Sequence, residues 1–248
     1  MFAMPDGKLI FIAAVFALAG VVKGVIGLGL PTISMGLLAI VMPPLEAAAL
    51  LVLPSFLTNV WQMAYGPALG PLLRRLWPMQ LCVCLGTWLG AGLMTGSYAR
   101  YGGMLLGVSL VIYACTAFMA RFTIASVHER WLGPVVGAIT GLITAATGVF
   151  VIPAVPYLQA IGLEKEELVQ ALGVSFTVST VALAVNLFRA GALNIAMAGP
   201  TMIALIVVGF GMWAGQVLRL HLSPELFRRC FFIGLLLLGI YLVGDALH

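Results

Sequence analysis

The chain has 248 residues, of which 62% are apolar or aromatic and only 8% are charged. Soluble domains carry about 25% charged residues, and 8 acidic and 12 basic side chains are too few to cover the surface of a soluble protein of this size. The composition therefore excludes a soluble fold and predicts an all-α integral membrane protein. The net charge of +4 does not indicate nucleic acid binding, because the basic residues are scattered over short loops, which is typical of anchoring at a cytoplasmic membrane surface.

Apolar segments between polar or proline-rich positions predict a helix bundle of about eight to ten membrane segments. The connecting loops are too short for a soluble domain, so we expect a single transmembrane domain over residues 1–248. A cleaved signal peptide is the alternative at the N-terminus, but cleavage would destroy the internal repeat described below. In chain order the predicted segments are 9–30, a short segment 31–42, 45–65, 79–97, 103–120, 132–148, a short segment 149–162, 168–188, 195–217 and 230–247.

Lysine and arginine residues indicate which loops are cytoplasmic. Loops 66–78, 121–131 and 218–229 carry most of the arginines and are therefore predicted to lie inside. The number of crossings that separate these loops agrees with this cytoplasmic placement only if segments 9–43 and 132–162 each begin and end on the same side of the membrane. Each is then a hairpin, made either of two short crossings or of a re-entrant pair of half-helices.

The two halves of the chain repeat weakly but in order. Gly20–Gly24 corresponds to Gly137–Gly141 with a shift of 117, and Leu53–Phe56 corresponds to Gly173–Phe176 with a shift of 120. A hairpin returns to the side from which it starts, so only the three further segments of each half change sides. Three is an odd number, so the copies, at about 8–120 and 130–248, should be inverted relative to each other. Inverted repeats with short, glycine- and proline-interrupted segments at matching positions are typical of secondary transporters with a site near the membrane midplane.

Candidate site residues lie at the two hairpin breaks and on the long helix after each break. Lys23 lies deep in an apolar segment, which costs about 2.5–3.5 kcal/mol on insertion scales; it is either a counter-charge for an anion or a side chain that snorkels to the interface. Glycine and proline at a break free backbone N–H groups that suit an anion, although glycine also serves close helix packing. Hydroxyl and amide side chains that share a helix face are lining candidates, and interhelical hydrogen bonding explains single ones equally well. The predicted substrate-binding residues are Lys23, Gly24, Gly27, Gly29, Pro31, Ser55, Thr58 and Asn59 in the first half, and Thr144, Thr147, Gly148, Ser175, Thr177 and Ser179 in the second.

No pattern indicates an enzyme or a metal site. The histidines and the acidic residues lie in loops, at the ends of apolar segments or at a terminus, so acid–base catalysis inside the membrane has no candidate residues. The cysteines lie in apolar segments without the spacing of a metal or disulfide site. We therefore expect no catalytic residue, no metal and no cofactor.

The glycine-rich strings resemble the sulfite exporter TauE/SafE family of membrane permeases. The resemblance rests on Gly20-Val-Val-Lys-Gly-Val-Ile-Gly-Leu-Gly-Leu-Pro31, on Pro43-Pro-Leu-Glu-Ala-Ala48, and on a looser second copy from Gly137 through Gly148 to Pro153. It covers essentially the whole chain and implies transport of sulfite, sulfonates or related anions across the bacterial inner membrane. The second copy departs from the family pattern with threonine and alanine at 144–147, where further glycines are typical.

Physical reasoning favours export of the anion. Each negative charge that leaves a negatively polarised cytoplasm gains about 2.3 kcal/mol per 100 mV, and the apolar segments hold no carboxylate that could bind a coupling ion. We expect a multi-pass inner-membrane permease whose partners are a small anionic substrate and the lipid bilayer, with no nucleic acid and with a homodimer as one option. Two alternatives stay open: an uptake permease for another organic anion, and a non-transporting subunit of a membrane complex.

Overall fold

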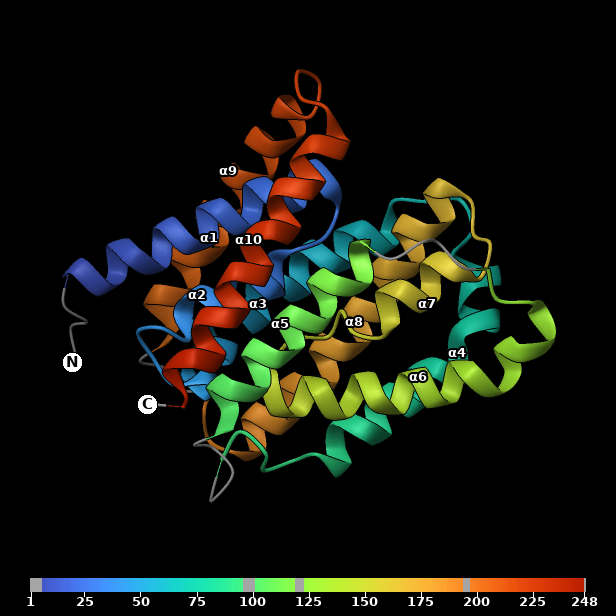
Figure 1. Ribbon diagram of the computed structural model, residues 1–248, viewed down its shortest axis with the longest axis horizontal. Helices are drawn as coiled ribbons and strands as arrows, with labels where there is room; N and C mark the ends of the chain where they lie inside the picture. The colour runs from blue at the N-terminus through green and yellow to red at the C-terminus, as the bar shows by residue number, and fades with distance from the viewer. Residues whose placement is uncertain (1–5, 96–100, 119–122, 194–196, 248) are drawn as a thin grey trace.

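The computed structural model describes residues 6–95, 101–118, 123–193 and 197–247. These residues form ten α-helices and no β-strand, which confirms the predicted all-α fold. Figure 1 shows the helices α1 (Asp6–Ile26), α2 (Leu30–Leu38), α3 (Pro44–Ala64), α4 (Leu69–Leu89), α5 (Gly102–Phe118), α6 (Ser126–Thr147), α7 (Ala154–Ala160), α8 (Lys165–Arg189), α9 (Ala198–Leu218) and α10 (Pro224–Asp245).

Five of these helices, α1, α3, α8, α9 and α10, are long and apolar enough to cross a membrane. Helix α5 is apolar but shorter, whereas α4 and α6 begin with charged turns that contain Arg74 and Arg75 in α4 and Glu129 and Arg130 in α6. The protein is therefore a multi-pass membrane protein.

The ten predicted segments correspond one to one to the ten helices. The largest differences are in α4, which begins ten residues and ends eight residues earlier than predicted, and at the starts of α6 and α10, which each begin six residues earlier than predicted. The arginine-bearing loops 66–78 and 218–229 are thus partly helical. A helix can continue into a polar flank where side chains cap it or pair with it, and hydropathy does not register such contacts. Arg121 and the predicted segment ends at 97, 120 and 195 lie outside the described residues.

Each predicted hairpin consists of one long helix and one short return helix. Helix α1 has 21 residues and α2 has 9, and α6 has 22 residues and α7 has 7. At 1.5 Å per residue, the long helices are about 30 Å in length, which matches the thickness of a bilayer core, whereas the short ones reach less than half of that thickness. The chain leaves α1 through Gly27 and Gly29 and leaves α6 through Gly148, all with positive φ (77°, 107° and 72°). Glycine adopts this left-handed conformation without a steric penalty, which lets the chain turn from each long helix into its short return helix.

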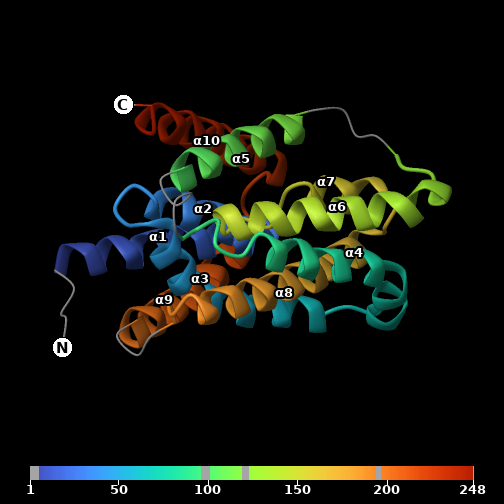
Figure 2. The same ribbon diagram turned by 90° about the horizontal axis from the view of Figure 1, so that it is seen from below.

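The return helices lie inside the molecule. Figure 2 shows α5 and α10 along one edge and α3, α8 and α9 along the opposite edge, with α2 and α7 between them. Eight of the nine residues of α2 are buried, and both return helices belong to the central apolar core. Irregular backbone at membrane depth is tolerated where protein surrounds it, and the two breaks meet this condition.

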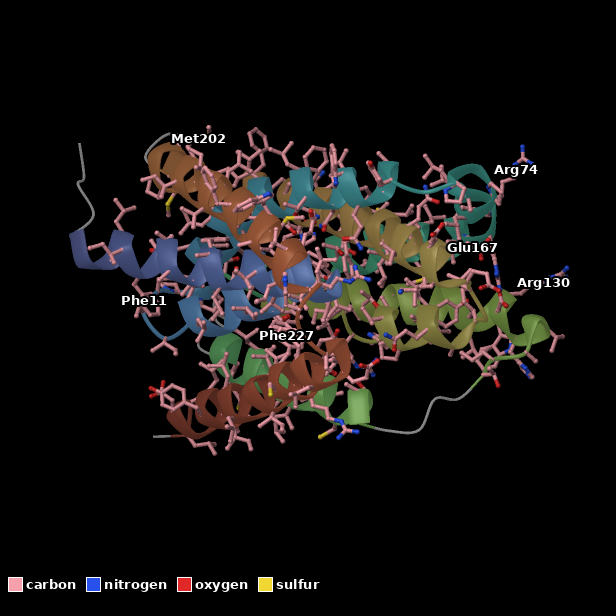
Figure 3. The ribbon with its side chains drawn as sticks, turned by 90° about the horizontal axis from the view of Figure 1, so that it is seen from above. Phe11, Arg74, Arg130, Glu167, Met202 and Phe227 are labelled. Carbon is pink, nitrogen blue, oxygen red and sulfur yellow. The ribbon has the colours of Figure 1, made fainter. Side chains whose placement is uncertain are left out.

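The four most extensive helix contacts keep the same pattern when the first five helices exchange places with the last five. The most extensive contacts join α1 with α9 and α4 with α6, and extensive contacts also join α3 with α8 and α5 with α10. Corresponding helices begin at opposite ends of the molecule: in Figure 3, Phe11 of α1 lies at the end opposite to Arg130 of α6, and Met202 of α9 at the end opposite to Arg74 of α4. This is the arrangement that two inverted copies produce, although the boundaries 8–120 and 130–248 stay a prediction.

Glycines permit the two closest helix contacts. A Cβ atom on Gly215 of α9 would lie 2.2 Å from the carbonyl oxygen of Val21 in α1, and one on Gly137 of α6 would lie 2.2 Å from that of Met79 in α4. Gly24 has the same role, since its Cβ would lie 2.3 Å from the carbonyl oxygen of Met212. The small-xxx-small spacing therefore serves close backbone approach, as it does in other membrane bundles.

Candidate functional site

Lys23 lies in the last turn of α1, just before the first glycine break. Its side chain is almost completely buried, with 4% of the residue exposed. A cation is favoured at this end of a helix because the unpaired carbonyl groups carry partial negative charge. The sequence alternative, a lysine that snorkels to the interface, does not describe this geometry, because the ammonium group points into the protein and binds side chains of α3.

Neutral side chains of α3 and α8 surround the Lys23 ammonium group. Lys23 Nζ donates to Thr58 Oγ1 at 3.0 Å and to Asn59 Oδ1. Asn59 Nδ2 in turn donates to Ser55 Oγ at 3.1 Å and to Thr180 Oγ1 at 3.3 Å. The network orients the amide of Asn59 so that its oxygen faces the lysine. The first-half candidates Lys23, Ser55, Thr58 and Asn59 thus form one cluster at the place where α3 and α8 pack together.

Within the described part of the chain, no carboxylate forms an ion pair with this lysine. The ion pairs among the described residues are Lys8–Glu46 at 4.0 Å and Arg75–Glu129 at 2.7 Å, neither of which involves Lys23. An ammonium group has three donors, of which Lys23 uses two. A buried cation with only neutral partners and a remaining donor is suited to bind an anion.

A cavity of about 790 Å³ extends from Lys23 towards one end of the molecule. It lies between the last turns of α1, α3 and α9 and the first turns of α8 and α10. At about 30 Å³ per water molecule, it has room for roughly 25 waters, and we refer to it as the vestibule above the Lys23 cluster. Its charged lining residues are Lys23, Lys165, Arg219, Arg228 and Glu225.

The excess of cations makes the vestibule attractive to anions. Four basic side chains and one acidic side chain line it, and a cleft of one charge sign between low-dielectric walls raises the local concentration of the opposite ion. The vestibule is formed by the helix ends that the arginine pattern predicts to be cytoplasmic. Figure 3 shows Arg74, Arg130 and Glu167 together at one end of the molecule.

The glycines and the proline of the first break have different surroundings. Gly24 and Gly27 line the vestibule, and a Cβ on Gly27 would meet no atom within 4 Å. Gly29 instead packs against Val22 and Phe231, and Pro31 is a buried residue in the first turn of α2. Of these four residues, only Gly24 and Gly27 therefore line the vestibule.

The second-half candidates do not line the vestibule. Thr144, Thr147 and Thr177 each donate their hydroxyl to a carbonyl of their own helix, four residues earlier, at 2.7 Å. Ser175 accepts a hydrogen bond of 2.7 Å from Gln80 Nε2, and the buried Ser179 hydroxyl has no partner among the described residues. A Cβ on Gly148 would lie 2.8 Å from the methyl group of Met35 in α2, so this glycine lies where the two hairpins touch.

Sequence reasoning missed several residues of this region. Arg219 and Arg228 were used only as markers of the cytoplasmic side, yet both line the vestibule. Trp61 and Tyr65 are stacked with ring centroids 5.3 Å apart and also line it. Their spacing of four residues at the end of an apolar segment was the available signal, but it does not distinguish a belt from a cavity mouth. Gln80 carried no signal beyond being polar in an apolar segment.

Comparison with protein families identifies the chain. Residues 12–242 match the family model described as sulfite exporter TauE/SafE. The chain belongs to the sulfite exporter TauE/SafE family. Members of this family are membrane transporters and not enzymes. No match was found among the curated proteins or among the solved structures. In this TauE/SafE member, the glycine-rich string that carried the resemblance is the end of α1, with the buried Lys23 and the break that borders the vestibule.

Proposed function

We propose that the protein exports a small sulfur-containing anion, such as sulfite or an organosulfonate, from the cytoplasm across the inner membrane. The observation that carries the proposal is the Lys23 ammonium group, buried at the base of a cation-rich vestibule and bonded only to neutral side chains. The anion would enter the vestibule from the cytoplasm, drawn by Lys165, Arg219 and Arg228, and displace water from Lys23.

The positions of the acidic residues support uncoupled export. Among the described residues, the acidic side chains lie in loops or in the terminal turns of helices, for example Glu46 at the start of α3 and Glu225 at the start of α10. The part of the chain that the structure describes has no cluster of three or more histidine, cysteine or acidic residues. Charged ligands for a coupling cation are thus lacking at membrane depth, while the membrane potential alone supplies about 2.3 kcal/mol per exported charge and 100 mV.

Proteoliposomes with an imposed potential test this function. Purified protein is reconstituted with sulfite, methanesulfonate, acetate or phosphate inside, and efflux is followed at zero potential and at an inside-negative potassium diffusion potential. We expect efflux of the sulfur anions to exceed that of the others and to rise with the potential. Efflux that ignores the potential but follows a proton gradient would refute electrogenic export. No protein-dependent flux of any anion would refute the permease.

A binding measurement separates the permease from a non-transporting subunit. A ligand that binds the native state raises its melting temperature in a concentration-dependent way. We expect sulfite or a sulfonate to raise the melting temperature of the detergent-solubilised protein, and chloride at equal ionic strength to have no such effect.

A further inference from the structure

Most buried threonines in these helices donate their hydroxyl hydrogen to their own backbone. Thr58, Thr87 and Thr144 are examples, with donor–acceptor distances of 2.8, 2.8 and 2.7 Å to the carbonyl four residues earlier. Thr140 of α6 and Ser179 of α8 do not follow this pattern, because their hydroxyl oxygens are buried without a hydrogen-bond partner among the described residues. Each leaves a donor unused in a dry interior, which is costly unless a ligand or water takes it.

Thr140 borders the middle of α4. The glycines on either side of it, Gly137 and Gly141, lie against α4: their Cβ atoms would be 2.2 Å from the carbonyl oxygen of Met79 and 2.3 Å from that of Val83. Thr140 itself is fully buried. Its side chain therefore lies inside the protein beside the stretch of α4 that begins at Met79.

Ser179 borders the same stretch of α4 from α8. Two hydrogen bonds join α8 to α4 there: Gln80 Nε2 donates to Ser175 Oγ at 2.7 Å, and Asn186 Nδ2 donates to the carbonyl oxygen of Thr87 at 2.7 Å. Residues 175, 179 and 186 share one helix face because they are four and seven positions apart. The Ser179 side chain thus lies on the α4-facing side of α8, between these two contacts.

The internal repeat relates this region to the Lys23 cluster. The shifts of 117 and 120 that align the two copies pair the residues of the two regions as follows: Lys23 with Thr140, Ser55 with Ser175, and Asn59 with Ser179. Corresponding helices run in opposite directions (Figure 3). A path that reaches the Lys23 cluster from one membrane face would, in the inverted half, reach Thr140 and Ser179 from the other face.

We propose that Thr140 and Ser179 form a second, uncharged anion subsite, which receives the substrate from the Lys23 cluster and releases it towards the opposite face. This proposal rests on the proposed function. Both hydroxyls are free to donate to an oxyanion. No charged residue occurs in α4 after Arg75, in α6 after Arg130, or in α8 between Glu167 and Arg189, so no fixed cation retains the anion in this region.

Two further unpartnered atoms in this region restrict the ligand. The Oε1 atom of Gln80 and the Oδ1 atom of Asn186 are buried and have no partner among the described residues, and a carbonyl oxygen accepts but does not donate. Both oppose a doubly charged anion, and one of them is satisfied by a singly charged oxyanion that keeps one proton. Hydrogensulfite has this chemistry, with oxygens for the two hydroxyls and one O–H for Gln80.

Flux measured separately from each membrane face tests the subsite. Sealed membrane vesicles of both orientations are prepared with wild-type protein and with Thr140→Val/Ser179→Ala, and the half-saturating sulfite concentration is determined from each side. The Thr140→Val/Ser179→Ala variant should require about ten-fold more sulfite at the face opposite the vestibule, since a hydrogen bond to a charged group is worth roughly one order of magnitude in affinity. At the vestibule face the value should change by less than about three-fold.

Matched variants separate this role from packing. Ser109→Ala removes a hydroxyl of α5 that is already bonded to the carbonyl oxygen of Leu105 in its own helix, at 2.8 Å, and it should leave both half-saturation values unchanged. Thr140→Ser keeps a hydroxyl at this position, so the half-saturating sulfite concentration of this variant should equal that of the wild-type protein. If the double variant is poorly folded, Thr140→Val and Ser179→Ala are measured singly, with the same one-sided increase expected.

The outcomes distinguish the subsite from the permease function. Unchanged half-saturation at both faces, or an equal rise at both, would overturn the subsite while leaving the permease intact, provided that wild-type protein transports sulfite and Lys23→Met does not. Wild-type vesicles without sulfite flux would overturn the permease function and the subsite together.

Discussion

Lys23 of α1 and Asn59 of α3 are joined by a hydrogen bond from the lysine ammonium group to the amide oxygen, with only 4% and 1% of the two residues exposed. The asparagine uses its amide hydrogens for Ser55 and Thr180, so its oxygen is held towards the lysine. A neutral partner lowers the cost of burying the ammonium group without cancelling its charge. That residual charge at the base of the vestibule leads to the first two predictions.

Replacing Lys23 with methionine should abolish anion transport without preventing folding. Methionine is unbranched, apolar and similar in length, so it fills the same space. We expect the initial rate of sulfite efflux to fall at least about thirty-fold, because loss of one member of a desolvated charge contact costs about 2–5 kcal/mol. Lys8→Met is the control: Lys8 is partly exposed, 4.0 Å from Glu46, and its loss should change the rate by less than about two-fold. Normal efflux by Lys23→Met would contradict a role for this charge.

Replacing Asn59 with aspartate should give Lys23 an internal counter-ion. The side chain keeps its shape, but its carboxylate would pair with the Lys23 ammonium group, which would then no longer be available to bind the anion. We expect sulfite no longer to raise the melting temperature, while the ligand-free protein melts about 2–4 °C higher, corresponding to about 1 kcal/mol for a protein of this size. Differential scanning fluorimetry with and without sulfite measures both effects.

Gln170→Glu is the control for that variant. It makes the same amide-to-carboxylate change in α8, outside the vestibule lining, where the side-chain nitrogen donates to the carbonyl oxygens of Met63 and Gly66 at 2.9 and 3.0 Å and not to Lys23. This variant should keep the sulfite-dependent shift. A shift that persists in Asn59→Asp, or disappears equally in both variants, would speak against direct competition for Lys23.

Features that depend on neighbouring residues were predictable from the sequence, and those that depend on distant residues were not. The breaks after α1 and α6 follow from local glycine runs, and the hairpins around them follow from the arginine count. By contrast, Gln80 and Ser175 are 95 positions apart, and hydropathy treats both simply as polar residues in apolar segments. Arg219 and Arg228 likewise join Lys23 around one vestibule only because α9 packs along α1, a contact that no local pattern encodes.

The pairing of Arg75 with Glu129 should hold the N-terminal parts of α4 and α6 together. Arg75 donates to both carboxylate oxygens, at 2.7 and 2.9 Å, and to the carbonyl oxygen of Ile161 beyond α7 at 2.7 Å. In a double-mutant cycle of Arg75→Gln and Glu129→Gln, we expect a coupling of about 1 kcal/mol, the upper end for partly exposed pairs. Arg75→Gln should lower the melting temperature more than Glu129→Gln, because it also removes the bond to Ile161. Equal shifts for the single variants would contradict the contact with Ile161.

The contact between α1 and α9 should tolerate a methyl group at one glycine of α9 and reject it at another. A Cβ on Gly215 would lie 2.2 Å from the carbonyl oxygen of Val21 and 3.0 Å from the Cα of Gly24, whereas one on Gly209 would meet no atom within 4 Å. Backbone atoms cannot rotate away, so Gly215→Ala should force the helices apart, with a loss of about 1–3 kcal/mol and a lower yield of folded protein. Gly209→Ala makes the same chemical change within the same helix, and it should be neutral or stabilise the protein by up to about 1 kcal/mol, since alanine favours helix over glycine. Melting temperatures and size-exclusion profiles of the two variants measure the difference, and equal behaviour would mean that α1 and α9 are not in backbone contact.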